Sequence, residues 1–380
     1  MVGGGPGAFI GAVHHRAATL DGMATIVAGA FSSNAERSRE QGAAYGLAPD
    51  RTYASFDEMA RREAELPEGE RIDFVSIVTP NHLHFPVAKA FIERGINVVC
   101  DKPLTTTLED AESLCRLVKK HDVVFALTHP YTAYPMVRQA RALVQGGALG
   151  TVRKIIVEYS QGWLSTPLEQ TGNKQADWRT DPARAGAGAI GDIGTHAEHL
   201  ARFITGLEME QLLADVSSFV PGRRIDDDAN MLVRYKGGAK GVLFCSQISV
   251  GEENRLAIRV YGTTASLEWH QQDPNFLTVR HPDGPTETYK PGHAFLAPAA
   301  QRGTRLPAGH PEGLHEAFAN IYSNAMRVML ARKAGETPDP LDLDFPTVRD
   351  GAAGVHFIQA ALRSGREGDW VDAAYVAPGA

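Results

Sequence analysis

Residues 96–103 read Ile96-Asn97-Val98-Val99-Cys100-Asp101-Lys102-Pro103, and this stretch decides the fold that we expect. An apolar run stops at a charged pair and then at a proline, which has no backbone N–H to continue a sheet. In α/β proteins, ligands bind outside the carboxyl ends of the parallel strands. The stretch therefore predicts a buried strand that places Lys102 at a ligand-binding edge. The alternative is a surface lysine in a turn.

Neighbouring segments repeat this order of strand, turn and helix. The apolar run 72–78 ends at Thr79 and Pro80, and Asn81 and His84 follow at the expected start of a helix. We predict further strands at 23–31 and 123–127 and further helices at 85–95 and 110–121. Such alternation is typical of an α/β domain with a parallel sheet.

A glycine-rich turn, residues 3–11, opens the chain. Glycines allow a tight turn and let a pyrophosphate approach the N-terminus of the following helix. Gly3 and Gly5 fit the GxGxxG spacing, whereas Gly11 comes late, so the dinucleotide site is predicted mainly from context. Only Met1 and Val2 precede the turn, and a buried strand has about five residues. We therefore expect the natural polypeptide to have residues before Met1.

The segment after the expected strand 23–31 lacks the acidic residue that dinucleotide folds place there to hold the ribose 2′-hydroxyl. It contains Ser32, Ser33 and Asn34, with Arg37 just beyond. Without a carboxylate nothing repels a 2′-phosphate, so NADP stays open as an alternative to NAD. A second role is compatible with this one, namely that Ser32 or Asn34 caps the next helix.

The pattern changes after residue 150. Residues 152–159 alternate like a half-exposed strand, and a long irregular stretch, 160–191, follows. Irregular segments of this length are functional or disordered, and its Trp163, Trp178 and Arg179 argue against disorder. Strand-like runs at 212–219, 229–235, 241–249, 255–261 and 265–269 predict a mostly antiparallel sheet, with helices at 313–333 and 347–363. We expect Asp226, Asp227 and Asp228 to form a solvated turn.

Residues 192–199 read Asp192-Ile193-Gly194-Thr195-His196-Ala197-Glu198-His199 and predict the start of a helix that ends before Gly206. Asp192 and His196 are four apart and therefore share one face. A histidine, with an ordinary pKa of about 6.5, suits a general base. Alternatively, Asp192 is only a helix N-terminal acid, or Asp192, His196 and His199 bind a metal. We predict no metal, because the order is not HExxH and three ligands on one helix is unusual geometry.

These landmarks together resemble the glucose–fructose oxidoreductase / inositol dehydrogenase (Gfo/Idh/MocA) family. They are the glycine-rich start, Thr79-Pro80-Asn81-His82-Leu83-His84, Asp101-Lys102-Pro103 (usually Glu-Lys-Pro in the family) and Gly191-Asp192-Ile193-Gly194-Thr195-His196. The resemblance spans nearly the whole chain. It implies an α/β protein with an N-terminal Rossmann domain, a doubly wound parallel sheet, over 1–130. A C-terminal α/β domain for substrate binding and oligomerisation, with a large, mostly antiparallel open sheet, would follow over 131–380.

The resemblance also implies an NAD(P)-dependent dehydrogenase that oxidises a secondary hydroxyl of a sugar or cyclitol. Segments 3–11, 175–182 and 309–313 are similar to the branch that contains levoglucosan dehydrogenase, which suggests an anhydrosugar. In this interpretation His196 is the base, Lys102 stabilises the developing alkoxide, and Asp192 holds the hydroxyl or orients the other two. Alternatives are an inositol dehydrogenase, a keto-sugar reductase, a dinucleotide-sensing regulator without catalysis and a metal-dependent hydrolase.

The expected cofactor is NAD, which the branch mostly uses, with NADP as the alternative. The candidate cofactor-binding residues are Gly3, Gly5, Gly7, Phe9, Ile10, Ser32, Ser33, Arg37, Thr79, Pro80, Asn81, His84, Asp101 and Lys102. The candidate substrate-binding residues are Lys102, Tyr131, Trp163, Trp178, Arg179, Asp192 and His196. Trp163 and Trp178 have a core role as their alternative, and His310 and Glu312 belong either to the pocket or to a loop before a helix.

Composition restricts the partners. The chain has 380 residues, 43% of them hydrophobic, and a formal net charge of −7, which gives no basic footprint for nucleic acid. The chain has three cysteines, an odd number, and each lies among apolar residues. This predicts reduced thiols in a cytoplasmic protein and no disulfide framework. No apolar run approaches the ~18 residues of a membrane span. We expect a cytoplasmic homo-oligomer, a dimer or tetramer, that acts on a small molecule.

Overall fold

The computed structural model describes residues 1–378. The chain forms two compact units, and neither is one continuous piece of sequence. The first unit contains Met1–Pro130 and Leu314–Ala352, and the second contains Tyr131–Gly313 and Ala353–Val376. The sequence assigned 314–352 to the second domain. In the structure this piece packs with the first unit, because α11 (Leu314–Lys333) lies against α1 (Phe9–Thr19) and β4 (Phe125–Thr128).

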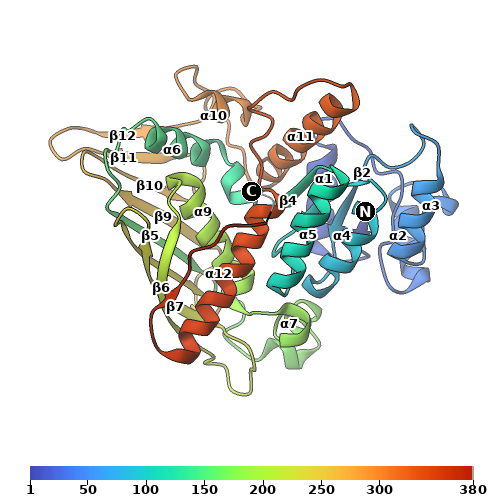
Figure 1. The fold of residues 1–380 in the computed structure, drawn as a ribbon, viewed down its shortest axis with the longest axis horizontal. Helices are drawn as coiled ribbons and strands as arrows, with labels where there is room; N and C mark the ends of the chain where they lie inside the picture. The colour runs from blue at the N-terminus through green and yellow to red at the C-terminus, as the bar shows by residue number, and fades with distance from the viewer. Residues whose placement is uncertain (379–380) are drawn as a thin grey trace. The chain divides into compact units, whose positions relative to one another are not determined.

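The first unit is built around a parallel sheet with the order β1-β2-β3-β4. The central strands are almost wholly buried, as their apolar sequences require, and helices pack on them. The remaining strands are β1 (Val2–Gly3), β2 (Phe74–Val78) and β3 (Asn97–Asp101). The remaining helices are α2 (Ala35–Ala44), α3 (Phe56–Glu65), α4 (His84–Ile92) and α5 (Leu108–His121), as Figure 1 shows.

The strand expected at 23–31 is largely absent, which corrects the sequence-based assignment. Only Gly29 and Ala30 form isolated parallel bridges, to Thr52 and to Val2. The rest of the segment has no strand beside it, because β1 has only two residues, and it lines a cavity of about 910 Å³ instead. When these two bridging segments are added beside β1, the order of the strands in the sheet is that of a doubly wound Rossmann fold. The predicted fold class is confirmed.

A buried polar cluster lies between α1, β2 and α11 of this unit. His14 Nδ1 lies 2.8 Å from the hydroxyl of Tyr322, and the hydroxyl of Ser76 lies 2.7 Å from the same oxygen. Nε2 of His14 has no hydrogen-bond partner among the residues that the structure describes. Burial lowers the pKa of His14 to about 4. The imidazole is therefore neutral in the folded protein at neutral pH.

We expect this histidine to make the protein sensitive to acid. Its pKa in the folded state lies below the ordinary 6.5, so between these values the unfolded chain binds more protons. The contribution of His14 leaves the free energy of unfolding unchanged above pH ~6.5 and lowers it by about 3 kcal/mol as the pH drops to ~4. Urea unfolding across this range measures the loss, and His14→Gln should reduce the slope whereas His82→Gln, at an exposed position, should not. An unchanged slope in His14→Gln would contradict the assignment.

The second unit contains a nine-stranded sheet with the order β12-β11-β10-β9-β5-β8-β7-β6-β13. Only β5 and β8 pair in parallel, so the predicted mostly antiparallel open sheet is confirmed. The strands are β5 (Lys154–Ser160), β6 (Met209–Ser217), β7 (Asp228–Tyr235), β8 (Lys240–Ser246), β9 (Arg255–Tyr261), β10 (Ser266–His270), β11 (Leu277–Arg280), β12 (Thr286–Tyr289) and β13 (Val371–Asp372). The sequence did not predict the last three of these.

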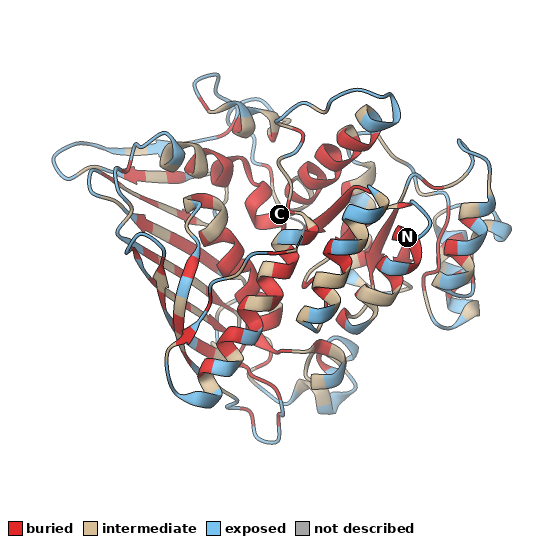
Figure 2. Cartoon of the chain, in the orientation of Figure 1, coloured by how far each residue is buried: buried red, intermediate tan, exposed pale blue. Residues whose placement is uncertain are grey.

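Helices cover one face of this sheet. They are α6 (Pro135–Gln145), α9 (Thr195–Thr205) and the part of α12 (Val348–Glu367) that belongs to this unit, as Figure 1 shows. Alternation along β7 follows from this one-sided cover: Met231 and Val233 are buried, whereas Leu232 between them is 48% exposed. Figure 2 shows the same alternation of buried and exposed residues along the strands. Three short segments, α7 (Lys174–Arg179), α8 (Pro182–Ala185) and α10 (Pro298–Arg302), interrupt the loops.

Candidate active site

In the glycine-rich turn of the first unit, the backbone runs so close to neighbouring backbone that a residue with a Cβ would not fit. A Cβ on Gly3, which has φ +85°, would lie 2.7 Å from the carbonyl oxygen of Val78, and one on Gly5 would lie 2.9 Å from that of Phe31. A Cβ on Gly11 would lie 2.5 Å from the Cα of Gly4. Gly11 therefore serves the close packing of α1 against the turn that follows β1, which explains why its spacing differs from GxGxxG.

Helix α1 starts at Phe9, within this glycine-rich stretch. Its N-cap residue Ala8 makes no side-chain cap bond, so the first-turn N–H groups are available to an anion. A Cβ on Gly7, where φ is +80°, would meet nothing within 4 Å, so open space lies beside the turn. Phe9 is exposed and Ile10 half-buried at the helix start. The turn and helix together fit a dinucleotide pyrophosphate.

The segment after the extended stretch, where the sequence predicted either a ribose site or a helix cap, forms the cap. Asn34 Oδ1 accepts hydrogen bonds from the N–H groups of Glu36 and Arg37, each at 3.0 Å, and thereby caps α2. The Ser32 hydroxyl accepts from the N–H of Asn34 at 3.2 Å. Arg37 reaches back and donates from Nη2 to the carbonyl of Pro6 in the glycine turn, at 3.2 Å. The first residues after the extended segment thus carry hydroxyls and a guanidinium, and Ser33 is exposed.

The carboxyl ends of β2 and β3 hold the next group of candidates. Both ring nitrogens of His84 face backbone carbonyls, Nδ1 at 2.8 Å from Pro103 and Nε2 at 3.0 Å from Thr79. Burial lowers the pKa of His84, against the opposing charge of Asp101. His84 therefore links the loop after β2 to the loop after β3. Its side chain is 1% exposed and offers almost no surface to a cofactor.

The Lys102 turn is shaped by its neighbours. Oδ1 of Asp101 accepts from the N–H of Lys102 at 2.8 Å and from the hydroxyl of Thr128 at 3.0 Å. The peptide bond between Lys102 and Pro103 is cis. Lys102 and Pro80 are half-buried and Asn81 is buried, all at the carboxyl edge of the sheet. This edge is where ligands of open α/β sheets bind.

In the second unit a π-helical turn, Ile190–Gly194, precedes α9. The sequence predicted one regular helix from Asp192, so the wider turn is a correction, and π-helical turns are frequent at functional sites. The carboxylate of Asp192 accepts from Nε2 of Gln247 at 2.8 Å and lies 3.4 Å from Nε of Arg179. Asp192 is therefore held by a cation and an amide, and it is more than a helix N-terminal acid.

Arg179 links Asp192 to both tryptophans. Its guanidinium lies 4.2 Å from the ring centroid of Trp178 and 6.0 Å from that of Trp163. Both tryptophans are half-buried, so the structure does not place them in the core. Four predicted substrate residues therefore form one cluster of aromatic faces and charges. Flat aromatic faces beside polar groups suit a ring that has C–H faces and peripheral hydroxyls.

His196 lies against two tyrosines. Its ring centroid is 4.7 Å from that of Tyr131 and 6.1 Å from that of Tyr159. The two tyrosine hydroxyls are 2.6 Å apart, and the hydroxyl of Tyr159 donates to Oδ1 of Asn254 at 2.7 Å. Burial raises the pKa of Tyr159 well above its usual range. His196 is thus 6% exposed and lies against the rings of these two tyrosines.

Four residues of this half were missed by sequence reasoning, namely Tyr159, Gln161, Gln247 and Asn254. Trp163 Nε1 donates to Oε1 of Gln161 at 3.0 Å, and Nε2 of Gln161 donates to Oδ1 of Asn254 at 2.8 Å. This chain of bonds joins the tryptophan cluster to the tyrosines around His196. Only Tyr159 had a sequence signal, its inward position in the alternation of 152–159.

Other candidates have structural roles. Glu312 accepts from the N–H groups of Arg305 and Leu306, at 2.5 and 2.8 Å, and closes the loop before α11, whereas His310 is exposed. The cysteines are free and buried.

In the described part of the chain, no group of three or more His, Cys, Asp or Glu side chains is placed to hold a metal ion. None of the described helices is long and apolar enough to cross a bilayer.

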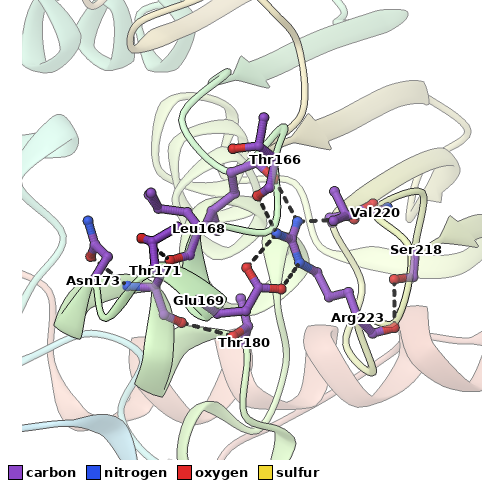
Figure 3. Close-up of polar contacts among 12 residues, drawn as sticks. Thr166, Leu168, Glu169, Thr171, Asn173, Thr180, Ser218, Val220 and Arg223 are labelled. Carbon is purple, nitrogen blue, oxygen red and sulfur yellow. Dashed lines mark hydrogen bonds and ion pairs between the residues drawn. The ribbon is translucent and has the colours of Figure 1, made fainter.

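The acidic triplet of the second unit is not a solvated turn, which corrects the sequence-based interpretation. Asp226 and Asp227 are buried, at 8% and 1% exposure, and only Asp228 is half-buried. Asp227 pairs with Arg223, and Figure 3 shows the guanidinium of Arg223 reaching Glu169 and Thr166 of the irregular stretch. These buried charges anchor the segment that carries Trp163, Trp178 and Arg179.

Comparisons with known proteins agree with this geometry. Residues 1–129 match the model of the oxidoreductase family with an NAD-binding Rossmann fold, and residues 137–268 match the GFO/IDH/MocA C-terminal domain. The uncharacterized oxidoreductase YfiI of Bacillus subtilis is 33% identical over 98% of this chain and 95% of its own length. The levoglucosan dehydrogenase of Pseudarthrobacter phenanthrenivorans is 29% identical over 55% of this chain and 58% of its own.

A crystal structure of an inositol dehydrogenase homolog from Azotobacter vinelandii, complexed with NADH and myo-inositol, superposes with a TM-score of 0.90. It is 35% identical and covers 98% of this chain and 96% of its own. The glycine-rich turn fits the pyrophosphate that this fold binds. The match to the NAD-binding family model, residues 1–129, includes the whole of this turn. The chain therefore belongs to the Gfo/Idh/MocA family of NAD-binding oxidoreductases.

Proposed function

We propose that the protein is an NAD-dependent dehydrogenase that oxidises a secondary ring hydroxyl of a cyclitol or of a sugar, including anhydrosugars. The observation that carries this proposal is the cluster in the second unit that joins Asp192 and Arg179 to two tryptophan faces. The relatives named for inositol and levoglucosan support the same substrate class. The buried, unpaired cysteines support a cytoplasmic location.

The proposed chemistry assigns one role to each of three side chains. His196 takes the proton of the reacting hydroxyl, and Asp192 accepts a hydrogen bond from the substrate and keeps it oriented. Lys102 supplies positive charge where the oxygen becomes alkoxide-like before the carbonyl forms. The glycine-rich turn and the start of α1 would hold NAD, which would supply the acceptor for the hydride of the carbinol carbon. Tyr131, Trp163, Trp178 and Arg179 are proposed to contact the ring of the substrate.

The proposed cofactor contacts fall into two groups. Gly3, Gly5 and Gly7 with the start of α1 hold the pyrophosphate, and Ser32, Ser33 and Arg37 hold the adenosine ribose. Thr79, Pro80, Asn81 and Asp101 line the edge near Lys102. His84 is proposed to act on the cofactor indirectly, by fixing the carbonyls of Thr79 and Pro103.

A substrate screen tests the function. Purified protein is assayed for cofactor reduction, followed by the absorbance of the reduced nicotinamide, with NAD and, separately, with NADP. The panel contains myo-inositol and other inositols, levoglucosan, aldohexoses and pentoses, and the reverse reaction is run with keto-sugars. We expect turnover of at least one ring polyol. Tight NADH binding without turnover of any substrate in either direction would refute the proposal and favour a dinucleotide-sensing regulator.

Cofactor choice gives a prediction at Ser32. The position directly follows the extended segment, where an acid would bond the ribose and repel a 2′-phosphate. We expect Ser32→Asp to lower the ratio of kcat/KM with NADP to that with NAD by tenfold or more, about 1.4 kcal/mol. Thr286→Asp, at the exposed start of the edge strand β12 in the second unit, is the control. An unchanged ratio in Ser32→Asp would show that the ribose lies elsewhere.

The uncovered face of the nine-stranded sheet supports a homo-oligomer. Cross-strand partners form a continuous apolar row of Leu213, Leu232, Val242 and Ile156 over four neighbouring strands. The row continues into Arg259 and Glu268, which offer charges of both signs. A surface with both apolar and mixed charged parts is complementary to a second copy of itself. We propose that this face joins protomers into a dimer or tetramer.

Leu232→Glu tests this interface. A carboxylate in the middle of the apolar row would be buried without a partner, at a cost of several kcal/mol to association. We expect light scattering to report a smaller assembly for Leu232→Glu, with the wild-type mass retained by Glu210→Lys at the edge of the sheet. A wild type that is monomeric at micromolar concentration would contradict the proposal outright.

A further inference from the structure

We propose that the connection between β6 and β7, residues 218–227, is a positioning clamp. Asp226 holds the π-helical turn that carries Asp192, and Arg223 holds the start of the irregular stretch that carries the tryptophans. Both are positioning residues that act through backbone. Their effect on catalysis rests on the proposed function, whereas their mechanical effect does not.

Asp226 binds three successive backbone N–H groups. Oδ1 accepts from Gly188 at 2.7 Å, Oδ2 accepts from Ile190 at 2.8 Å, and the backbone carbonyl of Asp226 accepts from Ala189 at 3.0 Å. A helix start leaves such N–H groups without partners inside the helix. The N-cap residue Ala189 supplies no side-chain bond, so Asp226 caps this turn from another loop.

The approach of the two chains is close enough to need a glycine. A Cβ on Gly188 would lie 1.8 Å from the carbonyl oxygen of Asp226. Burial raises the pKa of Asp226, and the N–H groups of Gly188 and Ile190 oppose that rise. Backbone N–H groups therefore stabilise the buried carboxylate of Asp226. A shift of Asp226 would therefore move Ile190, which lies two residues before Asp192 in the π-helical turn.

Arg223 uses its complete set of donors at the other end of the stretch. Nε and Nη2 bind the carboxylate of Glu169 at 3.1 and 2.9 Å, and Nη1 and Nη2 donate to the carbonyls of Leu164 and Thr166 at 2.7 and 3.0 Å. The remaining bond, from Nη1, goes to Asp227 at 3.2 Å. With a side chain 1% exposed, Arg223 fixes the chain directly after Trp163 (Figure 3).

Asp227 joins the two halves of the clamp. Its carboxylate accepts from the N–H groups of Phe219 and Val220, at 2.8 and 3.1 Å, and its carbonyl accepts from the N–H of Gln247 at 2.9 Å. The side chain of Gln247 in turn donates to Asp192. The connection therefore reaches Asp192 by two routes, through the π-helical turn and through Gln247.

The paired neighbours in the sequence provide matched controls. Asp228 is half-buried and Arg224 is exposed, so each differs from its neighbour in burial and contacts but not in chemistry. The test compares Asp226→Asn with Asp228→Asn, and Arg223→Lys with Arg224→Lys, in the full chain. Lysine keeps the charge of Arg223 but cannot bind two carbonyls and a carboxylate in one fork.

The first readout is hydrogen exchange, which needs no substrate. Asp226→Asn should speed exchange of the amides of residues 188–190 about tenfold, the equivalent of one lost hydrogen bond to a charged group. Arg223→Lys should speed exchange in 164–169 and leave 188–190 unchanged. Both control variants should match the wild type. Equal protection in Asp226→Asn and wild type would overturn the clamp.

The second readout is the maximal rate divided by the concentration of NADH-binding sites, which gives a kcat per folded site and corrects for unfolded protein. We expect Asp226→Asn to lower this value about tenfold and Arg223→Lys to raise the KM of the alcohol, at unchanged NADH affinity. A variant that only loses folded protein would keep the wild-type value per site, and that result would overturn the catalytic part. If the wild type turns over nothing, the proposed function fails while exchange still decides the clamp.

Discussion

Replacing His196 with asparagine lowers kcat for the ring alcohol by about 10²–10⁴, because a positioned general base contributes this much to proton transfer. Asparagine retains a similar shape between Tyr131 and Tyr159 but cannot take up the proton. Because the proposed pyrophosphate and ribose contacts come from other residues, the Kd for NADH should stay within about twofold of wild type. Stopped-flow reduction of NAD and fluorescence titration of NADH measure the two quantities.

His310→Asn is the control for this experiment, since His310 is exposed and its Nδ1 lies 3.2 Å from the carbonyl oxygen of Pro307 in its own loop. It should retain wild-type kcat. A His196→Asn enzyme with full activity would remove His196 from the mechanism. Tyr131 would then be the next base to test, through Tyr131→Phe.

Replacing Lys102 with methionine lowers kcat/KM by about 10²–10³, the range seen when one donor that stabilises a developing oxyanion is removed. Methionine preserves the length of the side chain in the half-buried turn after β3 but removes its positive charge. Because the charge acts on the alkoxide, the loss should appear in kcat as well as in KM. Lys102→Arg should recover part of the activity, which a purely structural lysine would not require.

Lys89→Met is the matched control, because Lys89 is an exposed lysine of α4 that pairs with Glu93 at 4.0 Å. It should leave both kinetic constants unchanged. A Lys102→Met enzyme that binds alcohol weakly but turns over at the wild-type kcat would show that Lys102 binds substrate without stabilising the alkoxide. Full activity would return Lys102 to the surface-lysine alternative.

Local patterns in the sequence predicted the parts of the fold that local chemistry controls. The apolar run that ends at Lys102 and Pro103 is β3, and the alternation at 152–159 is β5 with its ends shifted by one or two residues. The strand at 23–31 failed, because a strand also needs a continuous partner strand, and within this segment only Gly29 and Ala30 form β-bridges. The late Gly11 looked like a departure from the motif, and it is a packing contact with Gly4.

The candidate site divides in the same way. Residue types and order in the sequence singled out Asp192, His196, Trp163, Trp178 and Arg179, and the structure clusters the aromatic and charged members. Asn254 and Gln247 had no signal, since an amide in a strand or loop carries no local pattern. Asp226 was misjudged for a related reason: three adjacent aspartates are usually solvated, and burial depends on N–H groups that lie 36 and 38 residues away.

By itself, the sequence determined the family, the alternation of strands and helices, and the identity of the groups able to carry a proton or a charge. These follow from the period of apolar residues and from the intrinsic chemistry of each side chain. Only the tertiary structure decided which of these groups meet: the stacking of Arg179, the capping of a π-helical turn by Asp226, and the packing of α11 on the first unit. Contacts between residues far apart in sequence depend on the complete fold, because burial and the need to pair every buried polar group act only once the chain has closed on itself.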